Sequence, residues 1–285
     1  MTLSLSWIRK VGETEELIIA TDSRLRFGCA WDCCPKIFTL PRNDSAICFA
    51  GDTMHAYPIM ISIKNAIEMY PKLASRALDI RDARGHFIRV ITKMRQYIHD
   101  LPANLKTPEA PETFFIFAGY SWASQQFKIW VIKYDKSTDQ FIHETPQTIM
   151  KNSIAVTGDD VMEVRKRIYD KMVENGKKVG DGMDMEPFEI LRDKIREQSH
   201  NAIGGPPQIV KIYKHMNTMP YGVFWPNAKS KQVTYLGRPI LDYEMVPFPI
   251  LDPDTFETTT LKIENPEFPR IFDVGIKRNN HQNDF

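Results

Sequence analysis

Short segments of β-type residues recur along this chain in two groups, and each group is followed by two helical segments. Residues 2–8 alternate between apolar and hydroxyl side chains, which is the period of a half-buried strand. The polar turn at 12–16 joins them to the apolar run at 17–21, which predicts a hairpin. The same criteria predict further strands at 36–40, 46–50, 113–118, 127–134, 141–145, 153–156 and 207–213, with another candidate at 234–236.

Apolar residues at helical spacing predict four helices. They cover residues 53–73, where Pro71 marks the end, and residues 84–101, 160–175 and 186–201. Residues 25–35 are irregular, and residues 102–112 contain three prolines and are predicted to form a loop.

This element order predicts an α+β fold in which two sheets lie between two helical layers, a four-layer α-β-β-α sandwich. We expect one domain over residues 1–214. Residues 215–285 are expected to form a C-terminal extension that packs on the body or on a neighbouring subunit, because periodicity is weak beyond Asp242.

The composition excludes several classes of protein. Lys and Arg number 37 against 36 Asp and Glu, which disfavours a nucleic-acid-binding protein. The apolar runs are too short for a membrane helix, and the first residues lack the pattern of a secretory signal. Four cysteines without a Cys-x-x-Cys spacing predict neither a disulfide framework nor a metal site. We therefore expect a cytoplasmic protein, and nothing in the sequence implies a cofactor.

Thr2 is a candidate nucleophile because removal of Met1 would give it a free α-amine beside its hydroxyl. That amine titrates near about 8, so at neutral pH a useful fraction acts as a base for the hydroxyl. Met-Thr starts are common, and Thr2 alone is weak evidence. Its case depends on other residues at the ends of neighbouring strands.

Three short motifs follow Thr2 in order. Residues 20–24 read Ala-Thr-Asp-Ser-Arg after the second strand, Lys36 opens the third strand before Ile37 and Phe38, and residues 49–52 read Phe-Ala-Gly-Asp before the first helix. This order resembles the proteasome β subunit and its bacterial ring-protease relatives, a family of N-terminal-nucleophile (Ntn) hydrolases. The resemblance covers residues 2–214 and includes Val156-Thr157-Gly158 and the Gly-Gly-Pro-Pro segment at 204–207.

The resemblance implies a threonine-type peptidase that needs no metal or cofactor. Thr2 would be the nucleophile, Lys36 the cation that lowers the pKa of its hydroxyl, and Asp22 the partner of that lysine. Gly51 would donate its N–H to the oxyanion, and Thr157 would supply a hydroxyl near the amine. The first substrate pocket would be apolar and formed by Leu25, Cys34, Phe38, Phe49 and Thr53.

The sequence departs from the family at one point. The family places an Asp and a Ser near the amine where this chain has His200 and Ile203, with Ser199 and Asn201 nearby. A catalytically silent ring or scaffold subunit is therefore an alternative, as is an Ntn amidase acting on a small molecule. Asp22 and Lys36 also have a structural interpretation as an ion pair at a strand edge, and Gly51 as a simple turn residue.

The resemblance also implies partners. The substrate would be a peptide or an unfolded protein. The assembly would be a homo-oligomeric ring or stack of rings, served by an ATP-driven unfoldase.

Overall fold

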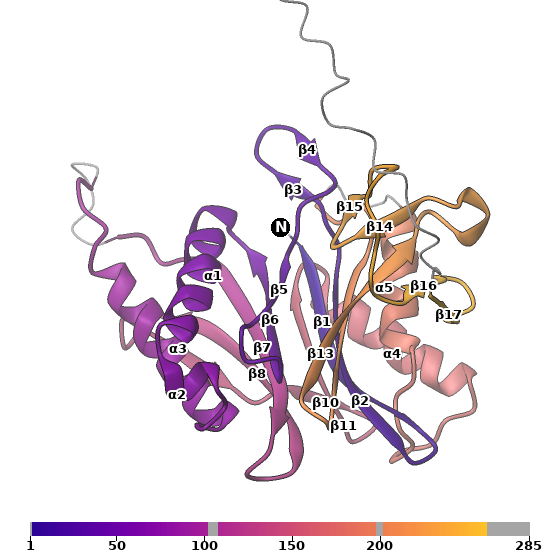
Figure 1. Cartoon of the computed structure of the whole chain (residues 1–285), viewed down its shortest axis with the longest axis horizontal. Helices are drawn as coiled ribbons and strands as arrows, with labels where there is room; N and C mark the ends of the chain where they lie inside the picture. Colours follow the sequence, from indigo (N-terminus) through magenta and orange to yellow (C-terminus); the bar gives the residue numbers. More distant parts are fainter. Residues whose placement is uncertain (1, 102–107, 198–201, 261–285) are drawn as a thin grey trace, which may run out of the picture.

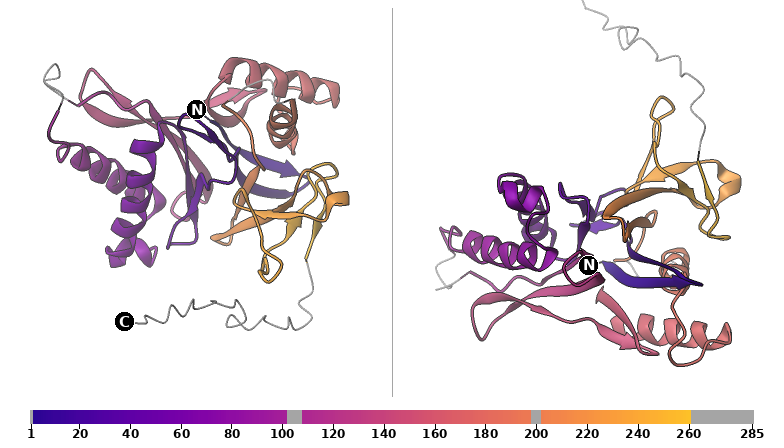
Figure 2. Two further views of the ribbon diagram at one scale, coloured as in Figure 1. Left: turned by 90° about the horizontal axis from the view of Figure 1, so that it is seen from above. Right: turned by 60° about the horizontal axis from the view of Figure 1, so that its bottom comes forward.

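The computed structural model describes residues 2–101, 108–197 and 202–260. The strands among these residues form two mainly antiparallel sheets, one of ten strands and one of five, together with the small hairpin of β3 (Leu25–Arg26) and β4 (Ala30–Trp31) (Figure 1). Helices α1–α3 lie beside the five-stranded sheet, and α4 and α5 lie beside the larger one, on the opposite side of the molecule (Figure 2).

The five-stranded sheet has the order β5-β6-β7-β8-β9, so every strand pairs with its neighbour along the chain. Its bounds are β5 Ile37–Thr39, β6 Ser45–Gly51, β7 Thr113–Ser121, β8 Gln126–Asp135 and β9 Gln140–Glu144. Its helices are α1 Thr53–Glu68, α2 Pro71–Ala74 and α3 Ile80–Arg95. Asp52 caps α1 by accepting a hydrogen bond from the Met54 N–H, so the strand that ends at Gly51 leads directly into a helix.

The ten-stranded sheet is built around the first hairpin, β1 Leu3–Val11 and β2 Thr14–Thr21. Its main path runs β10-β11-β1-β2-β12-β13-β14-β15, and β16 pairs with β13 and β17. The remaining bounds are β10 Gln147–Ile149, β11 Asn152–Gly158, β12 Gln208–Tyr213, β13 Asn217–Phe224, β14 Val233–Tyr235, β15 Arg238–Pro239, β16 Ile250–Leu251 and β17 Thr258–Thr259. Helices α4 Val161–Glu174 and α5 Glu186–Glu197 pack on this sheet, and the 3-10 turn η1 Ala228–Ser230 lies between β13 and β14.

The two sheets face each other across an apolar interface. Residues from β2, β5, β6, β7 and β12 meet there, among them Leu17, Ile37, Cys48, Ile116 and Val210. Trp7 belongs to a second cluster, between the larger sheet and its helices, and its indole N–H donates to the Asp184 carbonyl at 2.7 Å. The ends of β1, β2 and β5 are fixed by this packing, and the candidate site lies at those ends.

The predicted fold class is wrong. The chain is mostly antiparallel β-sheet, with 36% strand against 26% helix, and it is not the α-β-β-α sandwich typical of Ntn hydrolases. Part of the difference arises beyond residue 214, where β13–β17 enlarge one sheet. These strands have an apolar cluster of their own around Val233, Val246 and Ile250, and all of its members come from residues 224–250. Residues 217–259 therefore add strands to one sheet and no helical layer.

Two local differences have clear causes. Helix α3 begins at Ile80, four residues before the predicted start, because Asp79 and Asp82 form a capping box there. Strand β13 was not predicted because Pro220 interrupts its pattern. Pro220 pairs with Val210 of β12, while β14 and β16 pair with β13 only from Gly222 onward. A missing N–H is therefore tolerated at this position.

The hairpin of β3 Leu25–Arg26 and β4 Ala30–Trp31 occupies the segment predicted to be irregular. Within the described residues, no helix combines the length and the apolar character that a membrane crossing needs. The predicted loop at 102–112 and helix at 186–201 fall partly outside the described residues.

Candidate active site

Thr2, Lys36 and Asp22 lie in direct contact in the interior. The Lys36 ammonium donates to Thr2 Oγ1 at 2.7 Å and to Asp22 Oδ1 at 2.9 Å. Lys36 and Asp22 are fully buried, and Thr2 is 1% exposed. These residues are 14 to 34 positions apart in sequence, and the three strand ends bring them together as the sequence predicts.

Both carboxylate oxygens of Asp22 accept hydrogen bonds. Oδ1 accepts from the Lys36 ammonium and from the Leu3 N–H at 3.1 Å, while Oδ2 accepts from the Arg24 and Gly204 N–H groups, each at 3.1 Å. Each oxygen of the Asp22 carboxylate thus accepts two hydrogen bonds. A carboxylate so surrounded stabilises the buried lysine charge and has little capacity for a further partner.

Strand pairing explains why these side chains meet. Ser4 of β1 pairs with Thr21 of β2, and the Asp22 N–H continues the ladder to the Leu3 carbonyl. Thr2 and Asp22 therefore leave neighbouring strands at the same end. The Ser4 hydroxyl oxygen lies 2.9 Å from both Thr21 Oγ1 and the Phe49 carbonyl oxygen, and its single proton is donated between these two acceptors, which links this end to β6.

Gln208 fixes the approach of Lys36, a role that the sequence reading missed. Its Oε1 accepts the Lys36 N–H at 2.9 Å, and its amide nitrogen donates to the Cys34 carbonyl at 2.8 Å. Gln208 is 1% exposed. A glutamine at the start of a largely apolar strand was the available signal, because a buried amide needs hydrogen-bond partners.

The pKa of the Lys36 ammonium is lower than that of an ordinary lysine. Burial lowers the pKa of its ammonium, and the charge and hydrogen bond of Asp22 oppose that shift without cancelling it. Such a lysine remains a donor to a neighbouring oxygen and yields its proton more readily than a surface lysine. This is a suitable cation for stabilising a developing alkoxide on Thr2.

The turn after β11 contacts the backbone of Thr2. The Asp159 N–H donates to the Thr2 carbonyl at 2.9 Å. Gly158 has φ +108°, and a Cβ there would lie 1.7 Å from the Thr2 carbonyl oxygen, so glycine is required. The neighbouring Thr157 is buried, and its hydroxyl has no hydrogen-bond partner among the described residues.

A cleft of about 480 Å³ adjoins this group. Gly51 and Gly158 both line it, together with Leu25, Asp52, Thr53 and Asp159. Gly51 has φ +106°, and a Cβ there would lie 2.0 Å from the Glu112 carbonyl oxygen. The backbone at Gly51 is therefore close-packed on one side and faces the cleft on the other.

The residues predicted to form the first substrate pocket separate into two groups. Leu25 and Thr53 line the cleft. Cys34, Phe38 and Phe49 pack in the apolar core with Tyr57, whose ring lies 6.3 Å from Phe38 and 5.2 Å from Phe49. The Tyr57 hydroxyl donates to the Pro35 carbonyl at 2.8 Å. The space that the resemblance assigns to a substrate side chain is thus filled by this aromatic group.

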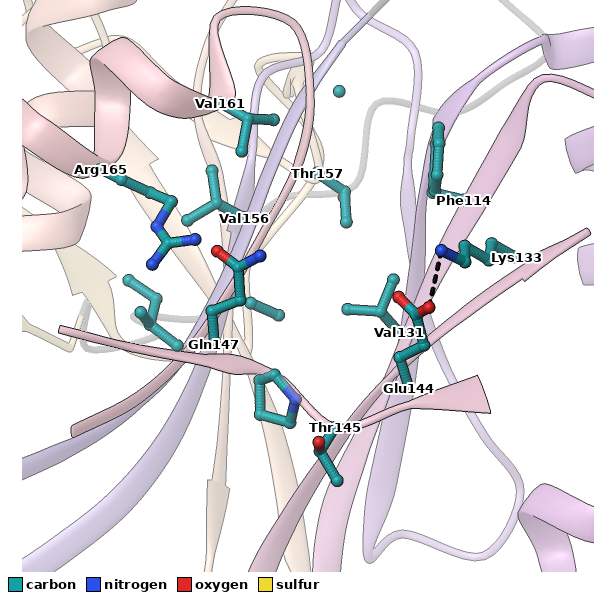
Figure 3. A pocket seen from close by; sticks show the side chains of 14 residues that line it. Phe114, Val131, Lys133, Glu144, Thr145, Gln147, Val156, Thr157, Val161 and Arg165 are labelled. Carbon is teal, nitrogen blue, oxygen red and sulfur yellow. Dashed lines mark ion pairs between the residues drawn. The ribbon is translucent and has the colours of Figure 1, made fainter. Parts of the chain in front are cut away.

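A second cavity of about 230 Å³ meets the cleft at Phe114 and Gly158 (Figure 3). Arg165 and Gln147 lie on one side of it, and the ion pair of Lys133 and Glu144 lies on the other. This cavity opens between β8–β9 and β10–β11, away from Lys36 and Asp22.

The departure at positions 200 and 203 is visible in part. Ile203 is buried in the core of the larger sheet, so it contributes packing and no polar group. His200, Ser199 and Asn201 lie outside the described residues. The four cysteines are free thiols, with Cys34 and Cys48 buried.

Comparison with known proteins adds nothing to these contacts, since no family model matches the chain and no curated protein matches it either.

Proposed function

We propose that this protein is a threonine-type peptidase whose nucleophile is Thr2 after removal of Met1. The observation that carries the proposal is the contact of the Lys36 ammonium with both Thr2 Oγ1 and Asp22 Oδ1 in a fully buried setting. A buried ammonium is costly unless it is paired. Its second contact, to a hydroxyl at the start of the first strand, is the chemistry that a nucleophile requires.

The reaction follows from these groups. The neutral α-amine of Thr2 takes the proton of the hydroxyl while the Lys36 ammonium stabilises the oxygen, which attacks the substrate carbonyl. In the proposal the Gly51 N–H stabilises the oxyanion. The α-ammonium then returns its proton to the leaving amine, and water hydrolyses the acyl-enzyme by the same steps in reverse order. Protons and bonds balance without a metal or cofactor.

A peptide is the substrate that best fits the cleft. Its lining includes the residues of β3 and the junction between β6 and α1. Because Tyr57 fills the neighbouring apolar space, we expect weak selection by a large side chain before the scissile bond. This supports an extended peptide or unfolded segment over a compact small amide.

The assembly and location belong to the same proposal. Helix α1 exposes Met54 at 83% and Ile61 at 52%, with Met69 at 77% just beyond its end, and exposed apolar groups of this kind favour contacts between subunits. We propose a homo-oligomer that accepts unfolded chains from an ATP-driven unfoldase. Four free thiols fit a reducing, cytoplasmic location. Sedimentation as a monomer at micromolar concentration would contradict the oligomer.

Peptide hydrolysis by the full-length protein tests the activity. The state of the N-terminus is first read by intact mass, and turnover is then measured on a panel of fluorogenic peptides and small amides. We expect hydrolysis of peptides by the trimmed protein and none by Thr2→Ala or Lys36→Ala. A chain that retains Met1 has no free amine on Thr2, and that result would favour the silent scaffold subunit instead.

A further inference from the structure

We propose that Asp159 is the residue that positions the α-amine of Thr2, an inference that rests on the function proposed above. Asp22 is unavailable for this role, because its two oxygens already accept four hydrogen bonds. An α-ammonium brings three donors into a closed site and requires an acceptor of its own. Asp159 offers a carboxylate at the right place.

The pairing of β1 with β11 sets that place. Leu3 pairs with Gly158 and Ser4 with Thr157, and the next step of the ladder is the hydrogen bond from the Asp159 N–H to the Thr2 carbonyl at 2.9 Å. Residues opposite each other in an antiparallel pair project to the same face, with Cβ atoms about 4.5–5.5 Å apart. Asp159 is thus the cross-strand neighbour of Thr2.

The charge of Asp159 acts electrostatically on Lys36, the direct partner of Thr2. Its carboxylate raises the pKa of the Lys36 ammonium, against the effect of burial. Lys36 contacts Thr2 Oγ1 at 2.7 Å. The negative charge of Asp159 therefore also acts on the α-amine of Thr2, which belongs to the same residue as that hydroxyl. Asp159 also lines the cleft, as Gly51 does.

Other ionisable groups face the same cleft, and they come from different elements. They are Arg26 of β3, Asp52 at the start of α1, Glu112 before β7, Tyr134 of β8 and Lys136 just beyond β8. Among these described groups and Asp159, only Asp159 is held against Thr2 by a backbone hydrogen bond. In the same proposal the Thr157 hydroxyl, which has no hydrogen-bond partner among the described residues, is a second acceptor for the amine.

The test is the pH dependence of covalent labelling of Thr2 by a peptide epoxyketone, measured on the trimmed full-length protein and on Asp159→Asn. A nearby carboxylate favours the ammonium form, so its removal should lower the pKa of the amine. We expect the acidic limb of the rate profile to move to lower pH by about one unit. We also expect the plateau rate to fall roughly 100-fold, because the amine loses its orientation.

Asp160→Asn is the matched control. Asp160 lies one position further on, pairs with Lys194 at 2.8 Å, and has φ +52°, which Asn adopts readily. Thr2 in this variant should be labelled at the wild-type rate, and the acidic limb of the pH–rate profile should stay where it is in the wild type. Asp159→Glu should recover part of the labelling rate that Asp159→Asn loses.

The two possible failures can be told apart. If the trimmed wild-type protein is not labelled at Thr2, the proposed function fails. If it is labelled and Asp159→Asn keeps the acidic limb of the wild type, whether or not its rate falls, the role of Asp159 is overturned and the proposed function stands. A rate loss without a shift is the result that a merely structural aspartate would give.

Discussion

Two fully buried ion pairs in this chain show what distinguishes the candidate site at the scale of single residues. Lys36–Asp22 and Arg42–Asp44 both have completely inaccessible side chains. Among the described residues, the Arg42 guanidinium donates to Asp44 and to the backbone carbonyls of Leu73 in α2 and Leu78 before α3. Lys36 donates to the Thr2 hydroxyl as well as to its aspartate. Burial alone therefore does not mark the site, and the contact with Thr2 does.

Substitution of the two aspartates separates structure from chemistry. Asp22→Asn and Asp44→Asn each leave a buried cation without its counter-charge, so each should cost about 3–5 kcal/mol in the free energy of unfolding. Only Asp22→Asn should abolish labelling of Thr2 in the fraction that remains folded. Chemical denaturation and labelling of the same samples check this. If Thr2 is labelled equally in the two variants, the ion pair of Lys36 and Asp22 has only a structural role.

Labelling of the wild-type protein should have a bell-shaped pH dependence. The rate rises as the α-amine loses its proton, near about 8 for an ordinary amine. It falls again when Lys36 loses its proton, because the hydroxyl then loses its cationic partner. Since burial lowers the pKa of Lys36, this descent should occur below the range of a surface lysine. A rate that stays level into that range would contradict the role of Lys36.

At the scale of elements, the end of β11 is the most constrained segment of the site. Gly158 has a φ of +108°, and a Cβ added there would lie 1.7 Å from the Thr2 carbonyl oxygen. The neighbouring Asp159 N–H bonds to that same oxygen. Any side chain at position 158 must therefore displace the start of β1, which carries the proposed nucleophile.

Gly158→Ala and Gly180→Ala form a matched pair. Gly180 has φ +104° and nothing within 4 Å of its added Cβ, so alanine there pays only backbone strain, about 1–3 kcal/mol. Gly158→Ala adds a collision, and we expect a larger loss of thermal stability and at least 100-fold slower labelling. Thermal unfolding and labelling rates check both variants. Wild-type labelling by Gly158→Ala would show that the position of Thr2 is not set by this turn.

The resemblance in the order of the motifs predicted the meeting of Thr2, Asp22 and Lys36, and each of these residues lies at or next to the end of a predicted strand. The sequence could not predict contacts that depend on which strands pair. Gln208 and Asp159 reach the site only through the pairing of β2 with β12 and of β1 with β11. The filling of the expected pocket by Tyr57 was equally hidden, since helical periodicity marks Tyr57 as apolar but does not give its depth.

At the scale of the whole molecule, the two sheets are unequal because the chain after residue 214 continues the larger one. The four-layer prediction failed partly for this reason, since proline and weak periodicity hid the strands that follow β12, apart from the candidate at 234–236 that forms β14. Tyr221, Val223 and Leu251 from this region are buried in the same cluster as Trp7 and Phe188. Arg196 of α5 also pairs with Asp254 at 2.6 Å. The C-terminal strands are thus integral to the core on that side.

Truncation tests the predicted boundary at residue 214. A chain that ends at 214 loses β13 and the buried side chains of Tyr221, Val223 and Leu251, and we expect no cooperative thermal unfolding. A chain that ends at 260 keeps every contact described here and should unfold within a few degrees of the full chain. Circular dichroism on heating distinguishes the two. Cooperative unfolding of the 1–214 chain would support an independent domain with an appended extension.

Covalent labelling of Thr2 tests its role as the nucleophile most directly. The trimmed protein is incubated with a peptide epoxyketone, which reacts with a hydroxyl and an α-amine on the same residue, and its intact mass is measured beside that of Thr2→Ala. We predict one adduct on the wild-type protein, located on the N-terminal peptide, and none on Thr2→Ala. A folded, fully trimmed wild-type protein that remains unlabelled would contradict the proposed function.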